Sequence, residues 1–429
     1  MMILKNLEPD IDDNEFKFLY PKYDGQSLPN VISTAMQVLG VDNGKTPIKK
    51  EFYNEHIGLD GINKVVVVAL DGFGYRLWTD YSNDKGFFGR IAKDGLLIPI
   101  TSVFPSTTAA AITTINTGLT PLEHGLPEWI LYMREIGMII NTLPFSAYMS
   151  EKYTSLMDLG VDSKILYDGS TIYEKLSEEG VASYTITTKG ISESAYTRLI
   201  KRGSIGNSFI HPSDAVIKLR HILESEKGPA YMNIYMDNID SATHNYGPFT
   251  EESRGEIDSI SNIFKTQLLD KIGSKAAKET LVIVTADHGH TSADPSRTAF
   301  MNDDRKLAGF LASDKGSKIL PTGSPRGVFL HINKEDIDEA QQHLSEKFKG
   351  VAKVVKSKDA IAHGFFGTGK PHKKFLDRAG DLLILPKDHE AIWYEHIKGR
   401  KPHYLGVHGG LSKNEMLVPL GMARLSDII

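Results

Sequence analysis

Short apolar runs recur along the chain, and more polar segments separate them. The runs are rich in Val, Ile and Leu, and they cover residues 65–70, 97–103, 182–187, 231–236, 281–285, 328–332 and 382–385. Near-continuous apolar character of this length is typical of strands that are covered on both faces. We therefore expect these runs to form buried parallel strands.

Helices are predicted in the segments between the runs. Residues 213–225 follow Pro212, and a proline at this point favours the start of a helix. Residues 171–179, 257–272 and 334–348 each end close to a glycine, which favours the end of a helix. Strands that alternate with helices at this spacing predict an α/β fold with a mostly parallel sheet, whose active site would lie beyond the carboxyl ends of the strands.

One stretch of the chain differs in composition from the rest. From about Ser292 to Gly380 the chain is richer in Lys, Asp and Gly. We interpret residues 296–380 as an inserted cap, with a small α/β unit around residues 328–355. Residues 1–295 and 381–429 would then form the two parts of a catalytic core.

Composition narrows the possible functions. The 429 residues are long enough to bury a large core, so a metal site here would serve chemistry rather than folding. The chain has no cysteine, which excludes thiolate catalysis and thiolate zinc sites. A net charge of −5 does not favour binding to a nucleic-acid polymer. The N-terminus lacks a secretory pattern and no apolar run reaches the roughly 20 residues of a membrane span, so we expect a soluble, cytoplasmic protein without a membrane partner.

Acidic and histidine residues follow two of the apolar runs directly. Asp71 follows the run 65–70, and Asp287 and His288 follow the run 281–285 after one alanine. A carboxylate buried at a strand end is costly unless it is paired or bound to metal, and adjacent Asp and His side chains can bind one cation. The alternatives are that Asp71 or Asp287 caps a helix and that His288 lies on the surface.

Two further histidine motifs are weaker when taken alone. Asp240 and His244 are four residues apart, which places them on one face if the segment is helical. Such a pair by itself favours a solvated helix face. His408 has glycines nearby on both sides, and in isolation this pattern favours a turn.

A threonine-rich segment supplies a candidate nucleophile. Thr108 begins a stretch of small residues, 108–116, that predicts a tightly packed helix. A hydroxyl at a helix N-terminus gains from the helix dipole and from free backbone N–H groups, which favour an alkoxide and an incoming phosphate. The alternative is that Thr107 or Thr108 is only an N-cap.

The order of these motifs resembles the type I phosphodiesterase and nucleotide pyrophosphatase family of the alkaline phosphatase superfamily. The resemblance covers residues from about 64 to 420. It rests on motifs that occur in the family's order, namely Asp71-Gly72, Thr108 ten residues before Gly118, Pro121 with His124-Gly125, Asp240 and His244 with Gly247-Pro248, Asp287-His288-Gly289, and His408-Gly409.

The resemblance implies an alkaline-phosphatase-like, three-layer α/β/α core and two divalent cations, with Zn²⁺ foremost and Mn²⁺ or other divalent ions also accepted. One ion would be bound by Asp71, Asp287, His288 and the Thr108 oxygen. The other would be bound by Asp240, His244 and His408. Thr108 would attack phosphorus and form a phosphothreonine intermediate, so the substrate would be a small anionic phosphate ester, either a phosphodiester or a nucleotide pyrophosphate.

Two positions depart from the family pattern. Trp129 stands where many family diesterases have Asn, and Thr107 stands where a Lys is common. We interpret Trp129 as a packed side chain, with the alternative that Trp129 and Glu128 shape the leaving-group pocket. We interpret His290 as a group that could orient a metal ligand. Four alternatives to a diesterase stay open, namely a phosphomonoesterase, a phosphonate hydrolase resembling phosphonoacetate hydrolase, a phosphomutase, and, from another class, a catalytically silent metal- or ligand-binding protein. The sequence leaves the oligomeric state open.

Overall fold

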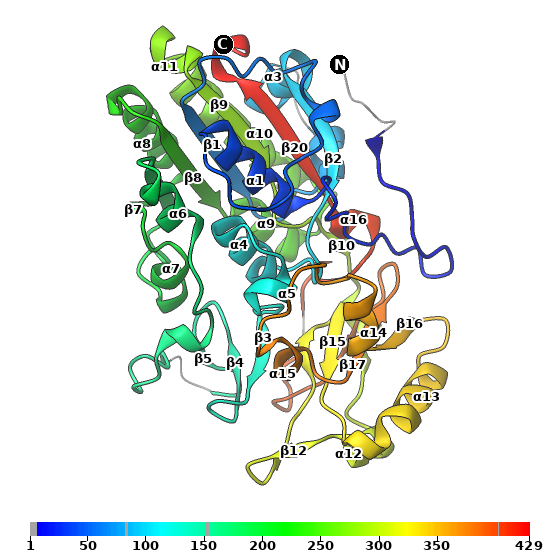
Figure 1. Ribbon diagram of the computed structural model, residues 1–429. Coiled ribbons are helices and arrows are strands. Elements are labelled where there is room, and N and C mark those ends of the chain that lie inside the picture. Colours follow the sequence, from blue (N-terminus) through cyan, green and yellow to red (C-terminus); the bar gives the residue numbers. More distant parts are fainter. Residues whose placement is uncertain (1–6, 82–84, 151–153, 402) are drawn as a thin grey trace.

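The computed structural model describes residues 7–81, 85–150, 154–401 and 403–429. Residues 1–6, on which the expected absence of a secretory signal partly depends, lie outside the described residues. Within the described part, two large sheets dominate the structure (Figure 1). The first lies near both ends of the chain, and the second lies beyond the carboxyl ends of the first sheet's strands.

The first sheet has β1 near its centre, and its parallel neighbours are β8 and β9. The neighbouring pairs β8–β6 and β6–β7 are also parallel, whereas β20 runs antiparallel to both β9 and β2. The predicted α/β fold with a mostly parallel sheet is therefore confirmed. In spatial order the strands are β2 (Leu96–Thr101), β20 (Leu417–Arg424), β9 (Thr280–Thr285), β1 (Lys64–Leu70), β8 (Ala230–Met236), β6 (Ala182–Thr188) and β7 (Ile205–Phe209).

Helices cover both faces of this sheet, which makes three layers. On one face, α1 contacts β1 and α4, and α6 contacts α4 and β6. On the other face, α2 and α3 contact β20, and α10 packs against α2, α3 and α8. The bounds of these helices are α1 (Leu28–Val38), α4 (Thr108–Thr117) and α6 (Ile172–Glu178) on the first face, and α2 (Tyr75–Tyr81), α3 (Phe87–Asp94), α8 (Pro212–Ser225) and α10 (Glu251–Phe264) on the second.

The strand β20 is not among the strands predicted from the sequence, and it contains a proline and a glycine. Proline cannot donate to a strand ladder, so its presence usually argues against a central strand. In the structure Pro419 faces Pro99 of β2 in register. Across these strands the Ser102 N–H donates to the Met416 carbonyl, and the proline pair lies three residues further along, where an antiparallel ladder makes no hydrogen bond between the two strands. Neither proline therefore costs a bond of this ladder.

The second sheet is antiparallel throughout its pairings. The runs 328–332 and 382–385 contribute to it as β15 and β17, so the prediction that they are parallel strands was wrong. Val328 and Ile384 pack into a separate hydrophobic core, while Phe329 and Leu383 belong to the main core. Their continuous apolar character therefore reflects burial on both faces and does not determine strand direction. The strand order is β16 (Ala352–Lys356), β17 (Leu382–Pro386), β15 (Gly327–Leu330), β14 (Thr322–Ser324), β3 (Ile130–Met133), β4 (Met138–Asn141) and β5 (Ser146–Ala147).

This second sheet takes strands from residues 130–147 as well as from 322–386. The division into a core and a cap over residues 296–380 stays a prediction. The remaining helices are α5 (Pro121–His124), α7 (Ala195–Ile200), α9 (Asn238–Tyr246), α11 (Ser274–Lys278), α12 (Arg305–Phe310), α13 (Ile337–Lys347), α14 (Ser357–Ala362), α15 (Phe375–Ala379) and α16 (Lys413–Met416). The remaining strands are β10 (Thr291–Ser292), β11 (Ala299–Phe300), β12 (Ser313–Asp314), β13 (Ser317–Lys318), β18 (Ile392–Trp393) and β19 (Gly406–Val407).

None of the helices in the described ranges combines the length and the apolar character needed to cross a bilayer. The cytoplasmic location stays a prediction.

Candidate metal centre

Acidic residues meet where the central strands of the first sheet end. Asp71 follows the last residue of β1, Asp240 lies in the first turn of α9 directly after β8, and Asp287 follows β9 by two residues. Because β1, β8 and β9 are adjacent and parallel, their carboxyl ends lie at one edge of the sheet. Two groups of side chains there have ligand atoms that all lie within 4.8 Å of one another and could hold a metal ion.

The first group consists of Asp71, Asp287 and His288, all of them buried. The His288 Nε2 atom lies 3.4 Å from Asp71 Oδ1 and 3.3 Å from Asp287 Oδ2. The hydroxyl of Thr108 lies 3.2 Å from the same Nε2 atom. The structure therefore brings the candidate nucleophile into contact with His288, which in turn lies against both carboxylates of the group.

The charge balance of this first group is unfavourable without a cation. Asp71 Oδ1 and Asp287 Oδ2 are buried and have no hydrogen-bond partner among the described residues. Burial, and next the charge of Asp287, raise the pKa of Asp71 well above its ordinary value. Burial raises the pKa of Asp287 to about 7. Paired buried acids with free oxygens, beside an imidazole, form a donor set that fits a divalent cation such as Zn²⁺ or Mn²⁺.

Neighbouring groups hold these two acids in place. The backbone N–H groups of Gly72 and His288 donate to Asp287 Oδ1 over 3.1 Å and 2.9 Å. The hydroxyl of Tyr235, from β8, donates to Asp71 Oδ2. Gly72 has φ of +71°, and a Cβ there would lie 2.8 Å from His290 Nε2, so a side chain at this position would collide with the site.

The second group consists of Asp240, His288, His290 and His408. The Oδ1 atom of Asp240 lies 2.9 Å from His290 Nε2 and 3.9 Å from His408 Nε2. His244, which was predicted as a ligand, lies outside this compact group, although its Nε2 is 3.4 Å from the same oxygen. The second group is therefore built from one carboxylate surrounded by imidazoles.

Hydrogen bonds to backbone carbonyls orient His408 of this group and the neighbouring His244. His244 Nδ1 donates to the Gly406 carbonyl over 2.7 Å, and His408 Nδ1 donates to the Ser106 carbonyl over 3.0 Å. In each ring the Nε2 atom then keeps its lone pair and faces Asp240, which is the tautomer that a metal ligand requires. Ser106 precedes Thr108 by two residues, so the segment of the candidate nucleophile also positions His408.

The electrostatics of the second group are the opposite of those of the first. Burial alone would raise the pKa of Asp240, but the neighbouring His244 and the contact with His290 hold this pKa below its ordinary value. Burial, and next the neighbouring His288, lower the pKa of His408 well below its ordinary value. The rings of His288 and His408 are stacked with centroids 3.6 Å apart. Neutral imidazoles of this kind can donate lone pairs to a cation.

Thr108 is the first residue of α4, and Thr107 occupies the N-cap position. The Thr107 side chain makes no capping hydrogen bond, and its Oγ1 is buried without a partner among the described residues. Thr107 is therefore the N-cap residue by position, as one alternative expected, but its side chain does not cap the helix. The first N–H groups of an α-helix have no intrahelical acceptor, so those of α4 remain available beside the Thr108 hydroxyl.

One contributor, Tyr235, was not recognised from the sequence, and His290 was expected to orient a metal ligand. The His290 ring lies directly against Asp240, which agrees with that role, and it also belongs to the second metal-capable group. The second histidine of Asp-His-Gly-His was the available signal. Tyr235 gave no signal of its own, because an aromatic residue in a buried strand looks like core packing. Only the adjacency of β1 and β8 brings it to Asp71.

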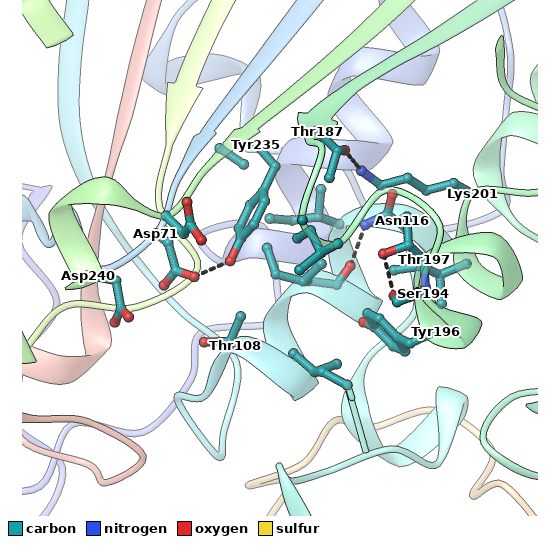
Figure 2. Close-up of a pocket in the computed structure, with 18 of the residues that line it drawn as sticks. Asp71, Thr108, Asn116, Thr187, Ser194, Tyr196, Thr197, Lys201, Tyr235 and Asp240 are labelled. Carbon is teal, nitrogen blue, oxygen red and sulfur yellow. Dashed lines mark hydrogen bonds between the residues drawn. The ribbon is translucent and has the colours of Figure 1, made fainter. Parts of the chain in front are cut away.

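A cavity of about 290 Å³ opens beside Asp71, Thr108 and Asp240 (Figure 2). Helix α4 and helix α7 line it, together with residues of β6 and β8. Trp129 also lines the cavity and is 37% exposed. Trp129 is therefore exposed rather than packed in the core, and it borders the same cavity as the candidate nucleophile, which agrees with the alternative that it shapes a substrate pocket.

Known proteins were compared with the chain in sequence and in structure. The family model of type I phosphodiesterase / nucleotide pyrophosphatase matches residues 65–411. A search of curated protein sequences gave no match. The fold is similar to that of murine ectonucleotide pyrophosphatase / phosphodiesterase 5, with a TM-score of 0.62, 17% identity, and coverage of 84% of this chain and 88% of that one.

Two further solved structures share the fold. An inactive variant of the same murine protein, in complex with AMP, gives a TM-score of 0.63 at 17% identity over 84% of this chain and 88% of that one. Phosphonoacetate hydrolase from Sinorhizobium meliloti 1021, in complex with phosphonoacetate, gives 0.60 at 18% identity over 85% and 93%. At these identities the likeness establishes the fold, and it confirms the predicted alkaline-phosphatase-like architecture.

The matched family segment begins at the second residue of β1 and ends shortly after His408. It therefore includes every residue of the two metal-capable groups. From this match, which covers most of the sequence, we conclude that the chain belongs to the type I phosphodiesterase / nucleotide pyrophosphatase family.

Proposed function

We propose that the protein hydrolyses phosphodiester or nucleotide pyrophosphate bonds through a phosphothreonine intermediate on Thr108. Family membership supports the reaction class. The observation that carries the proposal is the position of the Thr108 hydroxyl, 3.2 Å from His288 Nε2 and at the start of α4. A hydroxyl there faces both the acidic cluster and the positive end of a helix.

In this proposal two divalent cations serve as cofactors. Asp71, Asp287, His288 and the Thr108 oxygen would hold one ion, and Asp240, His244 and His408 would hold the other, with His290 beside Asp240. Bound cations would withdraw negative charge from the threonine oxygen and from the phosphoryl oxygens. We expect zinc first, because the imidazole-rich second group suits it, while Mn²⁺ and other divalent ions accept the same donors.

The residues of the chain divide the chemical work. The Thr108 hydroxyl loses its proton to solvent, and its oxygen forms a bond to phosphorus as the bond to the leaving oxygen breaks. Free N–H groups at the start of α4 stabilise the negative charge on the phosphoryl oxygens. Water then cleaves the phosphothreonine ester and restores the hydroxyl. The cavity next to Thr108 offers space for the organic part of the substrate.

The experiment is a substrate panel on zinc-loaded protein. Bis-p-nitrophenyl phosphate, p-nitrophenyl phosphate and phosphonoacetate should separate diesterase, monoesterase and phosphonate-hydrolase activity. We expect turnover of the diester to exceed that of the other two compounds. Turnover of the monoester alone would contradict the diesterase proposal.

The variant Thr108→Ala should lower kcat on the diester by about a thousandfold or more, because the nucleophile is lost. The matched control is Thr108→Ser, which keeps a hydroxyl and should retain measurable turnover. Full activity of the alanine variant would remove the nucleophile role. Absence of any turnover by the wild-type protein with metal bound would favour the binding-protein alternative.

Phosphonate hydrolysis is the second candidate. A phosphonoacetate hydrolase shares the fold. Lys201 and Asn233 also line the cavity, and they are hydrogen-bond donors that suit an anionic substituent. Faster turnover of phosphonoacetate than of the diester would favour this candidate.

A further inference from the structure

The cavity beside Thr108 has a direction that the helix α4 defines. Thr108, Ile112 and Ile115 all line it and lie on one face of that helix. They span about 10 Å of helix axis. The cavity therefore extends away from the reacting hydroxyl, along about two turns of α4, and into the layer between this helix and the sheet.

The two ends of the cavity differ in charge. The end near Thr108 carries the carboxylates of Asp71, Asp237 and Asp240. The far end carries Lys201, whose ammonium donates to the Thr187 hydroxyl (Figure 2). Between them the walls are largely apolar, with Ile112, Ile115, Ile191 and Ile200 and the rings of Tyr196 and Tyr235.

Lys201 has no acidic partner within salt-bridge distance among the described residues, and Thr187 is the hydrogen-bond acceptor that its ammonium reaches. Burial lowers the pKa of Lys201 to about 7. A partly buried ammonium without a counter-charge is costly, and an anionic oxygen arriving in the cavity would offset that cost.

Asn233 supplies a second unused donor to the same cavity. It is buried at 1% exposure, and its Nδ2 has no hydrogen-bond partner among the described residues. It lies on β8 two residues before Tyr235, so both side chains are on the same face of the sheet. Because Tyr235 donates to Asp71 at the strand end, Asn233 lies deeper in the cavity, away from that end.

We propose that this cavity receives the organic group attached to phosphorus, and that Lys201 and Asn233 bind a carboxylate or a second phosphate at the far end of that group. This inference rests on the proposed function, since it assumes that phosphorus lies beside Thr108. It narrows the substrate class to phosphorus compounds whose organic group is short, largely apolar and terminated by an anion.

A second hollow of about 220 Å³ shares Thr187, Thr197 and Lys201 with this cavity. Its other lining residues are polar, and Arg198 and Glu193 there pair with each other over 2.9 Å. Lys201 thus forms part of the wall between the two spaces. An anion could reach it from the hollow without any phosphorus group, and the test must separate these two routes.

The test measures binding by calorimetry to zinc-loaded protein, and so does not require turnover. The probes are phenylphosphonate, (4-carboxyphenyl)phosphonate, 1,4-phenylenebisphosphonate and benzoate. Wild-type protein should bind the carboxylate or the bisphosphonate probe about tenfold more tightly than phenylphosphonate, the effect of one charge-assisted hydrogen bond. We call the ratio of each probe's affinity to that of phenylphosphonate its affinity advantage. The probe with the larger affinity advantage identifies the bound anion as carboxylate or phosphate.

The variant Lys201→Met should reduce this advantage to about twofold or less and leave phenylphosphonate binding unchanged. The control Lys189→Met removes one exposed lysine from the neighbouring loop and should keep the full advantage. Asn233→Leu is a second variant, and it should also reduce the affinity of the carboxylate and bisphosphonate probes relative to that of phenylphosphonate.

The inference is overturned if wild-type protein binds all the phosphonates equally, or if Lys201→Met keeps the preference. It is also overturned if benzoate alone binds as tightly as (4-carboxyphenyl)phosphonate, because the anion would then belong to the second hollow. Selective binding without any diester turnover would leave this inference standing while removing the proposed function.

Discussion

The two metal-capable groups share His288 and lie side by side, yet they differ in the balance between acidic and imidazole side chains. Asp71 and Asp287 bring two buried carboxyl groups together with one imidazole. The other group surrounds the single carboxylate of Asp240 with imidazoles. The first group has too much potential negative charge for its buried position, whereas the second is nearly balanced.

This difference predicts unequal dependence on a cation. Unpartnered oxygens on Asp71 and Asp287 leave the acid-rich group unstable unless a proton or a metal ion arrives. In the histidine-rich group, His408 keeps its orientation through a bond to the Ser106 carbonyl, and the neighbouring His244 is held by a bond to the Gly406 carbonyl. We therefore expect the acid-rich group to change most on metal removal and the histidine-rich group to stay pre-organised.

The largest expected effect comes from breaking the acid-rich group. Asp71→Asn removes a charge next to Thr108 and should lower kcat/KM on the diester by about a thousandfold. The matched control is Asp237→Asn, which alters a carboxyl just past the next strand but outside both groups, and should cost less than about tenfold. Equal losses in the two variants would contradict the assignment of Asp71. Steady-state kinetics together with metal analysis would measure both.

The second effect concerns stability without metal, where the two groups should respond to pH in opposite directions. In the folded state Asp287 keeps its proton up to a pKa of about 7, whereas the unfolded chain releases it near its ordinary value of 3.8. The folded state therefore binds more protons in this range, and the free energy of unfolding should fall as pH rises from about 4 to 7. The loss is on the order of 3 kcal/mol.

His408 should give the reverse slope, because its folded pKa is lowered. Below its ordinary value of 6.5 the unfolded chain binds a proton that the folded state does not, so stability should fall as pH falls. Urea unfolding in a chelator, with Asp287→Asn and His408→Asn as variants, separates the two contributions. If the free energy of unfolding changes with pH in the same way in wild type and in Asp287→Asn between pH 4 and 7, then Asp287 is not the source of the pH dependence.

A smaller effect is expected from His290, the histidine that lies against Asp240. His290→Asn should weaken metal binding by roughly tenfold to a hundredfold, because it removes the closest imidazole contact of Asp240. His124→Asn is a control at another fully buried histidine, outside both groups. Competition with a chromogenic chelator would measure the affinity. Unchanged zinc affinity in His290→Asn would place this ring outside the centre.

The smallest effect is expected from Tyr235→Phe. The variant keeps the ring but removes the hydrogen bond to Asp71, which contributes about 1 kcal/mol, so kcat/KM should fall about fivefold. Tyr231→Phe lies in the same strand, and its buried hydroxyl has no partner among the described residues, so activity should not change. A larger loss at Tyr231 than at Tyr235 would contradict the positioning role.

The sequence by itself determined the α/β class, the mostly parallel sheet and the candidate ligands at strand ends. These follow from local pattern, because apolar runs report burial, and a charged residue directly after such a run is already unusual. The family order of the motifs could likewise be recognised from Asp71, Thr108 and Asp287 in the chain alone.

Tertiary structure decided what depends on pairing between distant segments. It placed 328–332 and 382–385 in a separate antiparallel sheet, and it paired β20 between β2 and β9 although β20 contains Pro419. It also brought Tyr235 to Asp71, His290 to Asp240, and Lys201 to the far end of the cavity. Local sequence reports whether a side chain is buried, but which charge or donor it meets there depends on strand order and helix packing, because those partners come from elsewhere in the chain.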